Sequence, residues 1–219
     1  MSSPTVLTIG SAVRDVFLFS KLFKVMPMPG SPGVMAECVT LGSKIDVDEL
    51  TIATGGGATN AAATFANLGF PTSLMSRIGD DTNGKEILAD LADRGINSSL
   101  VSVTKKEMTA YSTLLTAEGG ERTALVFRGA SANFTEKDIK LSKITADVVY
   151  LTSLAGNVAL ANAFNALVRH AAVGAESGTI RIPKVDYSRP SSYGSLELRY
   201  DRDAEFIGHA RTDVPLLLA

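Results

Sequence analysis

A turn of three consecutive glycines, residues 55–57, stands directly before Ala58-Thr59-Asn60 and a run of small residues, AAATFANLG, that predicts a helix. Without Cβ atoms, such a turn can approach a ligand closely and adopt positive φ angles. The first helical turn then offers unpaired N–H groups and the positive end of a dipole. Asn60 carries a donor and an acceptor, which suits a neutral ligand rich in hydroxyl groups. The alternative is a tight strand-to-helix turn capped by Thr59 or Asn60.

The elements that position this turn alternate between strands and helices. The expected strands span residues 5–9, 16–19, 73–78 and 147–152, and the expected helices span 58–68, 83–94 and 157–171, with a short helix from Thr135. A Pro/Gly loop is expected at 26–33. Extended runs at 34–41 and 45–53, and a hairpin at 110–116 and 122–128 with a Glu-Gly-Gly-Glu turn, predict a small separate β-sheet beside an α/β domain.

Composition excludes several classes of protein. A net charge of −2 over 219 residues provides no footprint for nucleic acid or an anionic membrane surface. No apolar run approaches the roughly 18 residues of a membrane span, and no signal peptide is indicated. Cys38 is the single cysteine, so no internal disulfide is expected and the cytoplasm is the natural setting. His170 and His209 are too few for a histidine-rich metal site.

A composite of motifs resembles the N-terminal half of the ribokinase-like (pfkB-type) carbohydrate kinases. The matching features are a first strand ending at Gly10-Ser11 with Asp15 shortly after, the strings GGGATN, AAATFANLG, SLMSRIGDDTNG and DRGIN, and the Glu-Gly-Gly-Glu hairpin. The resemblance covers about residues 5–171. It implies an α/β fold of three layers, α/β/α, with a small β-sheet lid whose strands match about 34–53 and 110–128.

The resemblance also implies a set of sugar-binding residues. In the family an acid after the first strand hydrogen-bonds sugar hydroxyls, and Asp15 matches it. Gly56, Gly57 and Asn60 match the glycine pair and asparagine that also hold the sugar. Arg128, at the end of the hairpin, would point toward the site and contact a substrate phosphate or hydroxyl. The alternatives are an Asx turn for Asp15 and a solvated strand end for Arg128.

Three departures from ribokinases themselves put ribose in doubt. Gly57 stands where those enzymes have a lysine, Val13 where they have an asparagine, and Ser153 near the place of a glutamate. Another sugar or a nucleoside is therefore favoured as the substrate.

A larger departure concerns catalysis. In the family, the base and anion hole lie on a Gly-Ala-Gly-Asp turn in the second half, and this string is absent here. The nearest string lies at residues 173–178 and has no aspartate, and residues 84–86 do not form a P-loop. We therefore expect no catalytic residues in this chain. ATP and Mg²⁺ are expected for the full family domain, without support from residues here.

Composition changes after about residue 172. We expect residues 1–172 to be the N-terminal part of the kinase domain, truncated after the early strands. Residues 173–219 form an atypical tail, either frame-shifted or disordered and foreign to the fold, or a divergent extension.

Three hypotheses on function follow. The first is ATP-dependent phosphorylation of a sugar or sugar-like hydroxyl, this chain carrying the sugar-binding half and being inactive alone. The second is a non-catalytic sugar- or nucleoside-binding or interaction module. The third, a dinucleotide-binding oxidoreductase, is disfavoured because GGGATN lacks the G-x-G-x-x-G spacing. The expected partners are a small sugar or nucleoside and a second copy joined through the lid, with no nucleic acid or membrane.

Overall fold

The computed structural model describes residues 3–139, 143–152 and 154. Its strands are β1 (Val6–Ile9), β2 (Val13–Phe19), β3 (Lys24–Pro27), β4 (Met35–Cys38), β5 (Glu49–Gly55), β6 (Thr72–Met75), β7 (Arg77–Gly79), β8 (Ser102–Thr104), β9 (Ala110–Thr116), β10 (Arg122–Phe127) and β11 (Val148–Leu151). Its helices are α1 (Gly57–Asn67), α2 (Thr82–Asp93), α3 (Gly129–Ala132) and the 3₁₀ turn η1 (Glu136–Asp138). The expected helix at 157–171 and the tail at 173–219 lie outside the described residues.

A parallel sheet in the order β11-β1-β6 forms the centre of the α/β part. Its central strand β1 is buried along its whole length, as a strand covered on both faces must be. Leu74 packs with residues of α1 and α2 in one core cluster, whereas Leu7, Ile9 and Met75 pack in a second cluster with Phe134. The α/β class expected from the sequence is confirmed.

Both long helices end where glycine permits a reversal of the chain. Gly69 follows α1 with φ 86° and Gly95 follows α2 with φ 67°, conformations that residues with a Cβ rarely adopt. Asp81 caps the start of α2 by accepting a hydrogen bond from the Gly84 N–H at 2.8 Å. These stops agree with the helix ends expected from the sequence.

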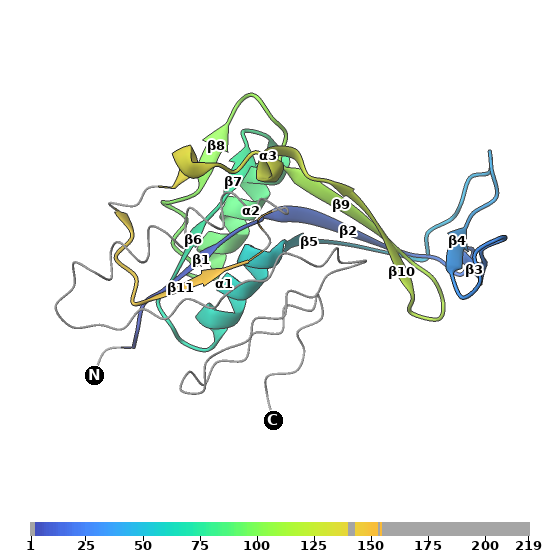
Figure 1. Cartoon of the computed structure of the whole chain (residues 1–219), viewed down its shortest axis with the longest axis horizontal. Coiled ribbons are helices and arrows are strands. Elements are labelled where there is room, and N and C mark those ends of the chain that lie inside the picture. Colours follow the sequence, from blue (N-terminus) through green and yellow to red (C-terminus); the bar gives the residue numbers. More distant parts are fainter. Residues whose placement is uncertain (1–2, 140–142, 153, 155–219) are drawn as a thin grey trace.

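A second sheet, here called the lid, has four strands in the order β10-β9-β2-β5. It extends away from the α/β part, and the small β3–β4 hairpin lies at its far end (Figure 1). β2 is central in the lid: it pairs antiparallel with β5 and parallel with β9. β10 pairs antiparallel with β9 and forms the predicted hairpin across the glycine turn.

The structure differs from the expected lid in two respects. Residues 34–41, expected as a lid strand, contain β4, which pairs with β3 in a separate two-stranded sheet and not with the lid. Lys24–Pro27 forms β3, although Met26 and Pro27 were expected in a loop. Proline has no backbone N–H to donate, and at the end of a strand this donor is not needed for pairing. In addition, η1 replaces the helix expected from Thr135 with a single turn, in which the Thr135 N–H donates to Asp138 Oδ2.

No helix within the described ranges is long and apolar enough to cross a lipid bilayer.

Candidate functional site

Asp15 lies on β2, the central strand of the lid, close to where the lid joins the α/β part. Its neighbours in register are Ala53 on β5 and Ser112 on β9. Burial raises the pKa of Asp15 above its ordinary value, and a hydrogen bond from the buried Ser112 side chain opposes this rise without cancelling it. Asp15 is therefore a half-desolvated carboxylate that retains acceptor capacity, which is what hydrogen bonding to neutral hydroxyl groups requires.

The Asp15 carboxylate lies directly against the glycine turn. A Cβ added to Gly55 would lie 1.8 Å from Asp15 Oδ2, so this position has room for glycine alone. Gly56 adopts φ 102°, and a Cβ there would lie 2.5 Å from the Ser11 carbonyl oxygen. The structure thus brings Asp15 together with the glycine turn, and at Gly56 both space and backbone conformation require glycine.

Ser11 satisfies the first donors of α1. The Gly57 N–H donates to Ser11 Oγ at 3.1 Å and the Ala58 N–H donates to the Ser11 carbonyl at 3.1 Å. The expectation that the first turn offers unpaired N–H groups is wrong for these two residues. The capping of this turn by Thr59 is also wrong, since the Thr59 hydroxyl donates to the Gly56 carbonyl at 2.9 Å and to that of Gly55.

Asn60 and Arg128 are both exposed. Asn60 lies in the first turn of α1, and its N–H donates to the Gly56 carbonyl at 3.0 Å, leaving the side-chain amide toward solvent. Arg128 follows β10, two strand positions from β2, or about 10 Å across the sheet. The solvated alternative for Arg128 agrees with its exposure, and an arginine side chain could still span most of that width.

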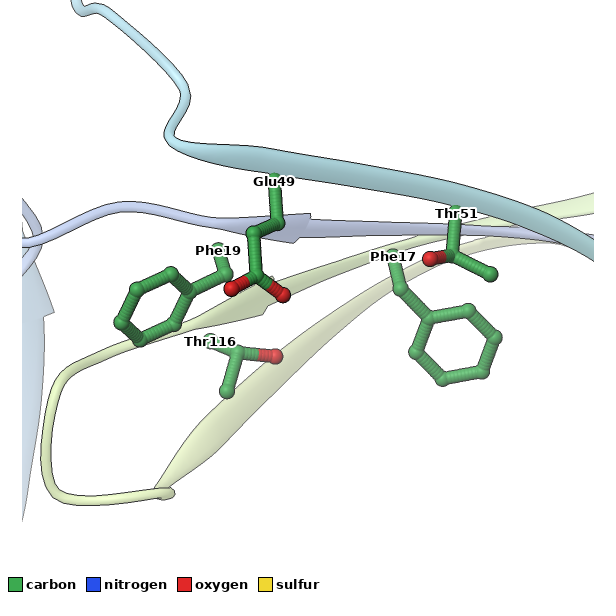
Figure 2. Close-up of a pocket in the computed structure, with 5 residues that line it drawn as sticks. All are labelled: Phe17, Phe19, Glu49, Thr51 and Thr116. Atoms are coloured by element: carbon green, nitrogen blue, oxygen red, sulfur yellow. The ribbon is translucent and has the colours of Figure 1, made fainter.

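A pocket of about 270 Å³ lies farther out on the lid. It is lined by Phe17, Phe19, Glu49, Thr51 and Thr116, and Figure 2 shows their side chains on one side of the strands. Because successive side chains alternate between faces, Phe17 and Phe19 share the face of Asp15. Phe17 lies about 7 Å beyond Asp15 along the strand and Phe19 about twice as far, so the Asp15 face continues outward as a partly aromatic surface.

Ser11 and Ser112 are the two residues of this site that sequence reasoning missed as participants. Ser11 belongs to the Gly10-Ser11 string, but its role depends on α1 beginning beside it in space. Ser112 is level with Asp15 only because β2 and β9 pair in parallel, and 97 residues separate them, so no local pattern could have revealed it.

No group of three or more His, Cys, Asp or Glu side chains within the described ranges is placed to hold a metal ion. No step of phosphoryl transfer is assigned to the described residues.

Comparison with known proteins identifies relatives of this arrangement. A family model described as "pfkB family carbohydrate kinase" matches residues 6–192. The chain is 28% identical to a ribokinase from Dictyostelium discoideum over 103 residues, which cover 47% of this chain and 32% of that protein. The matched segment thus spans about a third of the length of this curated relative.

Solved structures show the same fold. A ribokinase from Giardia lamblia superimposes with a TM-score of 0.60 at 21% identity, covering 78% of this chain and 48% of that one. The Arabidopsis thaliana ribokinase complexed with ribose and ATP superimposes with a TM-score of 0.52 at 23% identity, covering 68% of this chain and 45% of that one. The expected ribokinase-like fold is confirmed.

Proposed function

This chain belongs to the pfkB family of carbohydrate kinases. On that premise we propose that the site at the base of the lid, formed by Asp15 and the glycine turn at residues 55–57, holds a sugar for ATP-dependent phosphorylation of one hydroxyl group. The observation that carries the proposal is the Asp15 carboxylate, half-desolvated, paired with Ser112 and lying against Gly55. Charged acceptors in such surroundings make hydrogen bonds about twice as strong as neutral ones.

Each predicted site residue has a proposed role in binding. Asp15 accepts hydrogen bonds from sugar hydroxyls, and the backbone of Gly56 and Gly57 borders the sugar beside it. Asn60 adds a donor and an acceptor from α1, and Arg128 approaches from the outer strand of the lid. ATP, when bound, supplies the phosphoryl group, and the described residues of this chain bind and orient the acceptor.

The substrate class is a sugar or a nucleoside. The structural neighbour from Arabidopsis thaliana that was crystallised with ribose and ATP supports a pentose-sized ligand. Val13 and Gly57, which replace an asparagine and a lysine of ribokinases, favour a ligand whose hydroxyls are held differently from those of ribose.

A ligand panel tests the proposal. We expect ribose, fructose, other sugars or nucleosides to raise the thermal midpoint of the 219-residue chain, because their hydroxyl groups donate to Asp15. We expect no shift with NAD, because GGGATN lacks the G-x-G-x-x-G spacing of a dinucleotide site. We also expect a coupled ADP assay to detect negligible turnover, since no Gly-Ala-Gly-Asp string is present. Absence of any sugar- or nucleoside-dependent shift would contradict the proposed binding, and robust phosphorylation would contradict the proposed inactivity.

The proposed partner is a second copy of the chain, paired through the lid. The lid face opposite Asp15 carries Leu50, Ile52, Leu125 and Phe127, which are 50–61% exposed. Their registers place them on this one face, in neighbouring rows. Two such faces packed about a twofold axis would bury a self-complementary apolar surface.

Replacing Leu125 by lysine tests this pairing. We expect Leu125→Lys to shift the chain to monomer in sedimentation velocity, because the charge would be buried between the two lids. Val126→Lys is the matched control, since Val126 is 53% exposed but lies on the opposite face of the same strand. A monomeric unmodified chain, or equal effects of both substitutions, would exclude the proposed interface.

A further inference from the structure

The carboxylate of Asp81 joins the start of α2 to the start of lid strand β9. Asp81 Oδ1 accepts hydrogen bonds from the Gly84 N–H at 2.8 Å and from the Thr109 hydroxyl at 2.7 Å. Asp81 Oδ2 accepts from the Thr109 N–H at 2.7 Å. Gly84 is in the first turn of α2, and Thr109 is the residue directly before β9. The Asp81 side chain thus caps a helix of the α/β part and holds Thr109, the residue directly before a lid strand.

The residues around Asp81 and Thr109 are closely packed. Thr109 is 1% exposed, and its hydroxyl also accepts a hydrogen bond from the Gly79 N–H at 3.0 Å. A Cβ at Gly79 would lie 2.5 Å from the Glu107 carbonyl oxygen, and one at Gly84 would lie 2.2 Å from the Gly79 carbonyl oxygen. The two glycines therefore allow the backbone to approach Asp81 and Thr109 closely enough for all these hydrogen bonds to form.

Other contacts hold two more lid strands, β10 and β2, at the same end of the lid. The Ala130 N–H donates to the Met108 carbonyl at 2.8 Å, which attaches the end of β10 beside the start of β9. The Ser131 hydroxyl donates to the Ala12 carbonyl at 3.1 Å, which attaches the start of β2. Three of the four lid strands, β2, β9 and β10, are thus held at this base, and Asp81 contributes to holding β9.

The position of β9 matters to the sugar site because of Ser112. Ser112 lies three residues after Thr109 on a continuous strand, and its side chain bonds to Asp15. We propose that Asp81 is a positioning residue for the sugar site, which fixes the start of β9 and thereby places the Ser112 hydroxyl against the Asp15 carboxylate. This inference rests on the proposed sugar binding for its functional consequence, whereas the anchoring of β9 can be measured without any ligand.

The charge state of Asp81 is consistent with this role. Burial works against its charged form, but the hydrogen bonds from Thr109 and Gly84 and the charge of Lys85 outweigh it and lower the pKa of Asp81. The carboxylate therefore stays ionised, with both oxygens as acceptors, at any pH near neutrality.

Asp81→Ser separates anchoring from capping. Serine is as good an N-cap as aspartate, so α2 retains its cap, but a serine side chain has one oxygen and cannot bond both groups of Thr109. Asp80→Ser is the matched control, because Asp80 is the exposed neighbouring carboxylate. Thr109→Val is the second variant: it removes the hydroxyl and leaves the backbone bond to Asp81 Oδ2 in place.

Hydrogen exchange and sugar titration are the two measurements. In the full chain we expect Asp81→Ser to speed exchange about tenfold or more at β9 and the paired part of β2, with exchange in the middle of α2 unchanged. The Kd for the best sugar of the panel should rise about tenfold, because the hydrogen bond between Ser112 and the Asp15 carboxylate is lost. Thr109→Val should cause a smaller change in the same places, and Asp80→Ser none.

The outcomes distinguish the two proposals. Unchanged exchange at β9 in Asp81→Ser, or faster exchange in α2 and β9 alike, overturns the anchoring role. Faster exchange at β9 with an unchanged sugar Kd overturns the link to the sugar site. If the unmodified chain binds no sugar, the proposed function fails, and the exchange data still decide whether Asp81 anchors β9. If Asp81→Ser does not fold, Thr109→Val decides by the same comparisons.

Discussion

Replacing Asp15 by asparagine is expected to weaken sugar binding by at least about 100-fold, because two charge-assisted hydrogen bonds to hydroxyl groups are lost or weakened. The same substitution is expected to raise the thermal midpoint at neutral pH. Burial raises the pKa of Asp15, so the folded protein holds its charged form at a cost that the neutral amide avoids. Asp15→Asn should therefore improve stability while removing function.

The pH dependence of this gain has a definite sign. Because the folded pKa of Asp15 lies above its ordinary value of 3.8, the folded chain binds the Asp15 proton more tightly than the unfolded chain. The stability of the unmodified protein therefore falls as pH rises through the interval between those two values. The difference in thermal midpoint between Asp15→Asn and the unmodified chain should be near zero below this interval and reach its full size above it.

Calorimetric scans from pH 3 to 8 (about one scan per pH unit) and sugar titration at pH 7 test both effects. Asp93→Asn is the control, since it removes the same charge from an exposed position on α2. A lower midpoint for Asp15→Asn at neutral pH, or an unchanged sugar Kd, would contradict the proposed role of Asp15.

Gly10→Ala is expected to destabilise the fold by more than about 3 kcal/mol, among the largest effects of any single substitution. Gly10 ends β1 with φ 151°, and an added Cβ would lie 1.7 Å from the Thr152 carbonyl oxygen at the end of β11. The φ angle and the Thr152 carbonyl group both belong to the backbone, so the movement of a side chain cannot make room for the added methyl group. The central sheet would have to separate β1 from β11.

Chemical denaturation measures this effect, and Gly95→Ala separates conformation from space. Gly95 also has positive φ, 67°, but an added Cβ would meet nothing within 4 Å. Gly95→Ala should therefore cost only the backbone strain, about 1–2 kcal/mol. Equal losses for the two variants would show that the overlap with Thr152 has no part in the effect.

The helices and the lid hairpin could be predicted from sequence because their signals are local. Gly69 and Gly95 mark the ends of α1 and α2, and Gly119 and Gly120 mark the turn between β9 and β10. The central place of β2 in the lid could not be predicted in this way. Its neighbours β5 and β9 begin far along the chain, and a β-rich run does not specify which other strand it joins.

The candidate site was accessible to sequence reasoning only in part. The glycine turn was identified from its residue types and Asp15 through a family resemblance, and the structure adds the direct contact at Gly55. The roles of Ser11 and Ser112 depend on pairing between distant segments, which periodicity and spacing do not encode. Asp81 shows the same limit: the sequence identified the start of α2 there, and the second partner, Thr109, is 28 residues away.

The link between β1 and β2 constrains how the lid can move. Three residues, 10–12, separate the central sheet from the lid, and all three are held: Gly10 against Thr152, Ser11 by the start of α1, and Ala12 by Ser131. A rigid swing about this base would break all of these contacts at once. Closure over a ligand should instead come from twisting and bending of the distal half of the lid sheet, while residues 10–12 stay in place.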